Sequence, residues 1–416
     1  GLQDMTVGRP MDSLVRFSIP LLVGNLAQQL YNTVDSIVVG QYIGDTALAA
    51  VGTAGPILNL LLVLFMGIAT GASILSAQYF GAHDRQRLSR VVGASILLTV
   101  SSSILMGFVG FFASPWLMSL VNPPADVLDG AVIYLQIIFI GILGTATYNI
   151  LAGVLRGLGD SLMPLVSLLV ASLLNIVLDI VFVRDLRMGV AGVAVPTLVS
   201  RAVGAVIILS LAARRDYVLR ITPRTVTRLE GRTVRSILYI GIPSAFESSL
   251  FQLGRVLVVS MISLFGTVHI SANAVANNLD AVGCIVGNAM GLAMITVVGR
   301  CVGAQDFEQT KHYTKKLLLW DYIAQGTVNL LVLFFLNRIL GMYTLSPETR
   351  ALSWTLVMIH NGVAILLWPA GFVLPNALRA ANDVRFTMVT SILSMIVWRM
   401  GLSWILCVNM GMGAVC

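Results

Sequence analysis

The chain has 416 residues, of which 57% are hydrophobic and 11% are charged, and its mean hydropathy is +0.89. Because soluble domains carry about 25% charged residues, this composition excludes a soluble globular protein and indicates one that lies in a bilayer. The net charge of +7 comes from basic residues scattered between apolar runs, without the dense basic and aromatic surface that nucleic acid requires, so we expect no nucleic-acid partner. The four cysteines lack CxxC spacing, which argues against a disulfide framework or a zinc site.

Apolar runs of roughly 20 residues predict eleven membrane helices and an all-α polytopic fold. In chain order, the predicted spans are 14–40, 46–79, 90–114, 127–153, 161–183, 189–212, 236–265, 270–302, 313–336, 350–377 and 386–408.

The chain repeats four short features at offsets of 222 or 223 residues. They are Ile19-Pro20 with Ile242-Pro243, Gly81–Asp84 with Gly303–Asp306, Leu155–Asp160 with Leu378–Asp383, and Met188-Gly189 with Met410-Gly411. A constant offset across four features is not expected by chance. The repeat predicts a transporter built from two related lobes.

The lobes are expected to be six-helix bundles in a parallel pseudo-twofold repeat, because six crossings return the chain to its starting side. We predict an N-terminal lobe at 1–213, a basic cytoplasmic linker at 214–235 and a C-terminal lobe at 236–416. Matching the lobes predicts that Met410-Gly411 opens a twelfth helix, and this helix is expected to be absent because the chain stops at Cys416.

The distribution of Lys and Arg predicts the orientation. With a cytoplasmic N-terminus, 19 of the 26 basic residues fall in cytoplasmic segments, four fall in outer segments, and Arg201, Arg255 and Arg399 fall inside helices. This bias favours a multi-pass protein of the cytoplasmic (inner) membrane with its N-terminus inside.

Polar side chains in the first lobe point to an ion site. Span 14–40 carries a stripe at helical spacing that consists of Asn25, Gln28, Asn32 and Asp35. In span 161–183, Asn175 and Asp179 are one helical turn apart, and Thr197 in the next span falls at a similar depth. Gln28 and Asn32 are also candidates for a substrate or relay role.

Two carboxylates at one depth, with amide and hydroxyl oxygens, can hold Na⁺ through oxygen ligands or share a proton. The plainer alternative is a hydrogen-bonded cluster that only fixes helix packing. Arg201, one turn from Thr197, could pair with one acid and leave a single titratable group.

The second lobe carries different charges near mid-membrane, namely Glu247, Arg255, Asp280 and Arg399. Asn277 belongs to a polar stripe on the same span as Asp280. These residues are candidates for a substrate-lining or proton-relay site; the alternative is a neutral salt-bridge network of two acids and two arginines. We expect Asp321 to lie at the cytoplasmic interface. Pro369 and Pro375, beside Trp368, are the best hinge candidates.

Together these residues resemble the multidrug and toxic compound extrusion (MATE) family. The resemblance covers nearly the whole chain and rests on Asn32–Asp35 with Gly40 and Gly44, Asn175 with Asp179, the two Gly-Ala-x-Asp turns, Leu155–Asp160, and the Pro243-x-x-x-Glu247 start of span 236–265, which is similar to bacterial branches. It implies two bundles facing a central cavity, alternating access, and export of cationic amphipathic drugs against inward Na⁺ or H⁺, with a cation (possible Na⁺ metal) site at Asp35, Asn175, Asp179 and Thr197.

Three functional classes remain to be weighed. The favoured one is a monomeric secondary antiporter for small molecules, with H⁺ or Na⁺ as coupling ion and no other cofactor. The alternative is a lipid-linked precursor flippase of the same superfamily, which should have a strongly cationic cavity. An enzyme or receptor is least favoured, because the sequence lacks a nucleophile motif, a metal-spaced His pair and a phosphate-binding Gly-Lys-Ser/Thr loop.

Overall fold

The described part of the chain consists almost entirely of helices and contains no strand. The structure is a computed structural model, and it describes residues 10–42, 45–121, 125–213, 230–263, 265, 267–342, 345–409 and 411. The chain divides into two compact units, Gly1–Ala245 and Phe246–Cys416. Most of the predicted linker, residues 214–229, lies outside the described part of the chain.

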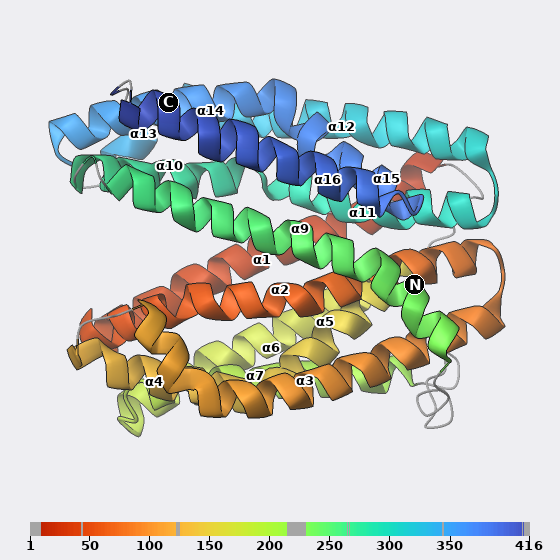
Figure 1. Ribbon diagram of the computed structural model, residues 1–416, viewed down its shortest axis with the longest axis horizontal. Coiled ribbons are helices and arrows are strands. Elements are labelled where there is room, and N and C mark those ends of the chain that lie inside the picture. The colour runs from red at the N-terminus through yellow and green to blue at the C-terminus, as the bar shows by residue number, and fades with distance from the viewer. Residues whose placement is uncertain are drawn as a thin grey trace. The chain divides into compact units, whose positions relative to one another are not determined.

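The first unit contains the helices drawn from red to yellow-green in Figure 1. They are α1 (Pro10–Tyr42), α2 (Asp45–Gly81), α3 (Arg85–Val121), α4 (Ala125–Ile140), α5 (Ile142–Gly157), α6 (Leu162–Ile180) with the π-helical segment η1 (Val181–Asp185), and α7 (Ala191–Ala212). An apolar core of Ala50, Leu58, Phe65, Leu135, Phe139 and neighbouring side chains lies among α2, α4 and α5.

The boundary between the units falls inside α9 (Gly231–Ser263). The first half of α9 packs on α2 within the first unit. A Cβ at Gly67 would lie 2.4 Å from the Cβ of Ala245, and one at Gly71 would lie 2.7 Å from the carbonyl oxygen of Ile237. Glycine is therefore required where these two backbones approach each other.

The second unit contains the remaining helices (Figure 1). They are the rest of α9, α10 (Thr267–Gly283), α11 (Ile285–Gly303), α12 (Phe307–Phe334), α13 (Leu336–Gly341), α14 (Pro347–Trp368), η2 (Pro369–Val373), α15 (Leu374–Ala380), α16 (Val384–Ser394), η3 (Met395–Leu402) and η4 (Trp404–Asn409). The η segments are π-helical. Cys284 and Cys301 are free, whereas Cys407 is disulfide-bonded, which the sequence did not predict.

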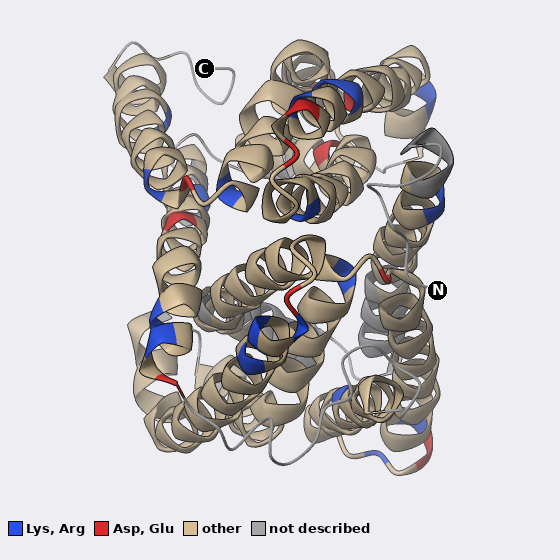
Figure 2. Cartoon of the chain, turned by 90° about the vertical axis from the view of Figure 1, so that its right-hand side faces the viewer, with Lys and Arg blue, Asp and Glu red and all other residues tan. Residues whose placement is uncertain are grey.

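The predicted all-α polytopic fold is confirmed, and every predicted span has a helical counterpart. By length and composition, eight helices of the described chain could cross a membrane, or nine if α4 and α5 form one span. Figure 2, a view onto the ends of the helices, shows ribbons that are mostly tan, with charged residues confined to a few positions.

Each unit contains an interrupted helix, and the interrupted helix differs between the two units. The sequence predicted neither interruption. In the first unit, α4 and α5 meet at Gly141 with a bend of 53°, and a Cβ there would lie 2.5 Å from Cγ of Leu198. In the second unit, the break falls between α10 and α11 at Cys284. Each break depends on what packs beside it, so the hydropathy of one span cannot predict it.

Two of the repeated sequence features share one local structure, which ends one helix and starts the next. In each, the residue before an aspartate has a positive φ: His83 and Gln305 at 57°, Gly159 at 88° and Asn382 at 71°. The backbone N–H of the aspartate then donates to the carbonyl five residues earlier. These bonds are Asp84 to Tyr79 at 3.0 Å, Asp160 to Leu155 at 2.9 Å, Asp306 to Cys301 at 3.1 Å and Asp383 to Leu378 at 2.8 Å.

The same four aspartates cap the following helices. Their Oδ1 atoms accept from the backbone N–H three residues later, which belongs to Arg87, Met163, Gln309 or Phe386. A Schellman-type stop and an N-cap together satisfy backbone groups that a helix end leaves without intrahelical partners. The sequence repeat therefore records a repeated backbone turn.

Replacing one capping aspartate tests this role. Asp306→Ala removes the acceptor for Gln309 N–H and should lower the free energy of unfolding by about 1 kcal/mol, read as a lower thermal unfolding midpoint in detergent. Asp306→Asn is the matched control and should remain close to the original protein, because asparagine also caps. Equal losses in both variants would contradict the capping role.

Candidate functional site

The first helix of the first unit runs parallel to its fifth membrane span. The hydroxyl of Ser161 donates to the carbonyl of Phe17 at 2.8 Å, and the amide of Asn175 donates to the hydroxyl of Tyr31. Both contacts join residues 144 apart. A constant separation along two helices means that α1 and α6 run in the same direction in fixed register.

The predicted pair on α6 is deeply buried. Asn175 is 3% exposed and Asp179 is 0% exposed. Asn175 reaches Tyr31 on α1, and its own Oδ1 is buried without a hydrogen-bond partner. Sequence reasoning missed Tyr31, although it lies one turn before Asp35. Tyr31 could have been found from the sequence, because it follows Gln28 by three residues and therefore lies on the same face of the helix as the polar stripe.

The side chains of Asn32 and Asp35 lie outside the described part of the structure, whereas their backbone continues α1. Asp35 follows Tyr31 by four residues, as Asp179 follows Asn175. The parallel register therefore puts position 35 of α1 opposite position 179 of α6. Gln28 is half-buried and interacts with another residue.

Thr197 lies on α7, which packs against α6. A Cβ at Gly204 would lie 3.3 Å from the Cβ of Ala171, so these positions face each other. Counting seven residues back along α7 and seven forward along the oppositely directed α6 brings Thr197 to the level of Leu178, one residue before Asp179. Its hydroxyl donates to the carbonyl of Val193 at 3.2 Å, which leaves lone pairs on the oxygen available.

In the second unit, Glu247 pairs with an arginine that the sequence assigned to a loop. Oε1 of Glu247 accepts from Nη2 of Arg379 at 2.6 Å and from the hydroxyl of Ser391 at 2.8 Å. The side chains of Arg379 and Glu247 are 18% and 13% exposed, and Nη1 of Arg379 also donates to Asn376. Glu247 and Ser391 are again 144 residues apart, so α9 and α16 repeat the register of α1 and α6.

Asp280 pairs with a histidine rather than an arginine. Its Oδ1 lies 3.1 Å from Nδ1 of His360 and accepts from the thiol of Cys284 at 3.4 Å. The balanced network of two acids with Arg255 and Arg399 is therefore wrong as a set of ion pairs. Asn277 is exposed on α10, two turns before the break near Cys284. Asp321 is completely buried among protein side chains, so the expectation of a side chain that reaches out to the membrane interface is wrong.

Arg399 contacts an aromatic side chain. Its guanidinium carbon lies 5.0 Å from the ring centre of Phe251, which packs edge-to-face on Phe372, and Phe372 stacks on Trp368 at 4.9 Å. Arg255 follows Phe251 by one turn and is exposed. The hinge candidate Pro369 opens the π-helical segment η2, and Pro375 lies at the start of α15.

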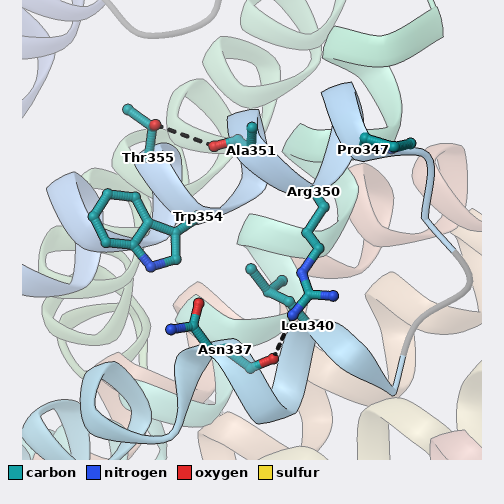
Figure 3. A pocket seen from close by; sticks show the side chains of 7 residues that line it. All are labelled: Asn337, Leu340, Pro347, Arg350, Ala351, Trp354 and Thr355. Carbon is teal, nitrogen blue, oxygen red and sulfur yellow. Dashed lines mark hydrogen bonds between the residues drawn. The ribbon is translucent and has the colours of Figure 1, made fainter.

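A separate cavity of about 560 Å³ lies between α13 and α14 (Figure 3). Arg350 donates from Nη2 to the carbonyl of Asn337 at 2.9 Å, as Figure 3 shows, and Trp354 lies one turn farther along. None of the predicted site residues lines this cavity. Within the described residues, no group of three or more His, Cys, Asp or Glu side chains could hold a metal ion.

Two repeated helical units with buried, titratable groups in their membrane helices are the arrangement of a polytopic transporter. The MatE family model matches residues 20–181 and again residues 243–405. The chain belongs to this family, which confirms the resemblance drawn from its motifs.

Curated relatives align over most of their length. "Probable multidrug resistance protein YoeA" of Bacillus subtilis is 26% identical over 386 residues, covering 91% of this chain and 83% of the relative. "Probable multidrug resistance protein YpnP" of the same organism is 27% identical over 401 residues, covering 95% and 88%. "Probable multidrug resistance protein NorM" of Thermotoga maritima is 22% identical over 398 residues, covering 94% and 85%.

Solved structures share the fold. One described as "Crystal structure of MATE in the straight conformation" has a TM-score of 0.91 and 24% identity, covering 98% of this chain and 91% of that one. Another, described as an outward-facing multidrug resistance MATE family transporter of the MOP superfamily, has a TM-score of 0.88 and 23% identity, covering 98% and 90%.

The Glu247–Arg379 pair can be tested by a double-mutant cycle. Glu247→Gln should lower the free energy of unfolding by roughly 3 kcal/mol, because it leaves the charge of Arg379 buried and uncompensated. The double variant Glu247→Gln/Arg379→Met should recover much of this loss, measured by thermal unfolding in detergent. The single variant Arg379→Met completes the cycle. If the losses in Glu247→Gln and Arg379→Met simply add in the double variant, the two side chains are not coupled.

Proposed function

We propose that this transporter is a secondary antiporter that exports amphipathic, cationic small molecules such as drugs and toxins by alternating access, in exchange for inward H⁺ or Na⁺. The relatives carry names that refer to multidrug resistance. The buried Asn175–Asp179 pair, held against Tyr31 in fixed register, is the observation that most supports ion coupling.

The proposed coupling site consists of Asp35, Asn175, Asp179 and Thr197. Asp179 is fully buried in a membrane helix, where an ionised carboxylate is costly unless it has a compensating charge. Asn175 contributes a buried amide oxygen without a hydrogen-bond partner, and Thr197 contributes a hydroxyl at the same level. Oxygen ligands of this kind suit Na⁺, and two carboxylates at one level suit a shared proton.

The proposal includes a location and an assembly state. The excess of Lys and Arg in segments such as 214–235 favours the cytoplasmic membrane with the N-terminus inside. Each unit supplies its own packed core, so we propose that the monomer is the working form.

Conservative substitutions in the first unit test ion coupling. Asp35→Asn and Asp179→Asn should each abolish exchange, because neither amide can bind a proton or balance a cation. The measurement is ethidium efflux from reconstituted vesicles under separately imposed Na⁺ and proton gradients. Size-exclusion profiles identical to that of the original protein would establish that the variants are folded. Full transport by either variant would remove the ion site.

Two arginines favour a second candidate, a flippase for lipid-linked anionic precursors. Arg255 and Arg399 lie in membrane helices, and neither forms an ion pair with an acid among the described residues. Arginines in membrane helices face protein or a water-filled cavity rather than lipid. A cationic surface of this kind would attract a phosphate and repel a cationic drug.

The charge of the transported molecule decides between the candidates. For the antiporter, Arg399→Gln should retain or increase ethidium efflux, because it removes a repulsive charge. For the flippase, the same variant should lose translocation of a fluorescent polyprenyl-phosphate lipid in proteoliposomes by roughly tenfold, since one charge-assisted contact is worth about 1.5–3 kcal/mol. Translocation of this lipid by the original protein, without ethidium efflux, would contradict the antiporter proposal.

A further inference from the structure

A column of buried polar side chains runs along α12 in the second unit. Asp321, Gln325 and Asn329 follow one another at intervals of four residues, so they lie on one face of the helix. They are 0%, 0% and 1% exposed, respectively. The first unit, 222 residues earlier, has Thr99, Ser103 and Gly107 at these positions on α3. The carboxyl and the two amides are thus a property of the second unit only.

Asp321 and Gln325 can interact in two protonation states. With its amide nitrogen toward Asp321, Gln325 donates to the two carboxylate oxygens at 3.2 and 3.3 Å. With its amide oxygen in the same place, Gln325 can instead accept the hydrogen of a protonated Asp321 carboxyl. A simple rotation of the amide therefore serves both the ionised and the neutral acid.

Asn329 continues the column toward α14. The point where a Cβ of Gly283 would stand lies 2.3 Å from Oδ1 of Asn329 and 3.3 Å from Nδ2 of Asn361. Asn361 is 0% exposed, and its amide donates to the carbonyl of Leu279 at 3.4 Å, whereas its Oδ1 has no hydrogen-bond partner. Glycine at 283 leaves room for the two amides to approach each other, and an unsatisfied acceptor remains beside them.

The column ends next to a titratable pair at the surface of the unit. His360 precedes Asn361 in α14, and its Nδ1 lies 3.1 Å from Oδ1 of Asp280. The side chains of His360 and Asp280 are 56% and 30% exposed. Because ionisable groups in membrane helices face protein or water rather than lipid, this pair is suited to exchange protons with water.

Among the residues that the structure describes, no basic side chain forms an ion pair with Asp321. The titratable or charged side chains on the helices packed against α12 are His269 and Asp280 in α10, Cys284 at the break, Arg300 and Cys301 in α11, Arg338 in α13, Glu348, Arg350 and His360 in α14, and Arg379 in α15. Among the described residues, none of them forms an ion pair with Asp321. Arg300 lies on the order of 16 Å from the depth of Asp321, counted along the two helices.

We propose that Asp321 is a proton-binding site of the second unit, and that Gln325, Asn329 and Asn361 form a polar path from it to the Asp280–His360 pair. A fully buried carboxyl without a cationic partner is most stable when it carries a proton. The amides line the path between Asp321 and His360, and His360 takes up the proton from water or returns it. This site is separate from the coupling site proposed on α1, α6 and α7.

Infrared spectroscopy of the reconstituted full chain, without substrate, tests the site directly. The spectrum at neutral pH should contain the carbonyl stretching band of protonated carboxyls, and Asp321→Asn should remove the part of the band that Asp321 contributes. Thr327→Val is the matched control, because Thr327 lies on the exposed side of the same helix and its hydroxyl donates only to the carbonyl of Ile323. The control should retain the band. Identical carboxyl bands in the original protein and Asp321→Asn between about pH 5 and 9 would overturn the proposal.

The path is tested by transfer to deuterated buffer, which shifts the same band as the proton exchanges. Asn361→Leu should slow this shift by roughly tenfold, because it replaces the buried amide between Asn329 and His360 with an apolar side chain. Asn329→Leu provides a second interruption should Asn361→Leu fail to fold, as judged by size exclusion. Unchanged exchange in a folded variant would overturn the path. Neither measurement depends on transport, so a failure of the proposed antiport would not be mistaken for a failure of this site.

Discussion

The structure depends on one constraint: in hydrocarbon, each backbone N–H and carbonyl must find its partner within the protein. Long helices meet this constraint along their length but not at their ends. The turns around Asp84, Asp160, Asp306 and Asp383 meet it there, because each aspartate donates its N–H to the ending helix and accepts an N–H from the starting one. This is why the loops, rather than the apolar helices, preserve the repeat most visibly.

The same constraint explains how far the sequence could predict the fold. Apolar length predicted a helix at each of the eleven spans, and eight or nine of the described helices are long and apolar enough to cross a membrane, because a membrane helix must cross about 30 Å of hydrocarbon. It could not predict the bend at Gly141, which depends on Leu198 from another helix, nor the break at Cys284. Nor could it predict the π-helical segment at Pro369, because the effect of a proline on a helix depends on how neighbouring groups satisfy the freed carbonyl.

The polar sites were predicted by residue type but not by pairing. Asn175 and Asp179 stood out because amides and acids are rare in membrane helices, and the structure buries both. The partners Tyr31, Arg379 and His360 were missed, because each comes from a helix distant in sequence or from a segment assigned to a loop. Asp321 was placed at the interface by its distance from the helix end, whereas only packing reveals that it is fully buried.

The two units use one arrangement of helices for different chemistry. A parallel pair with a separation of 144 residues joins Tyr31 to Asn175 in the first unit and Glu247 to Ser391 in the second. In the second unit, Arg379 neutralises the acid of this pair, so the charge there is already balanced. The uncompensated acid lies instead on α12, where the first unit has a threonine. A duplicated scaffold fixes where helices meet but not which side chains meet there. Each unit can therefore hold its titratable group on a different helix, and the repeat alone cannot identify the titratable group of either unit.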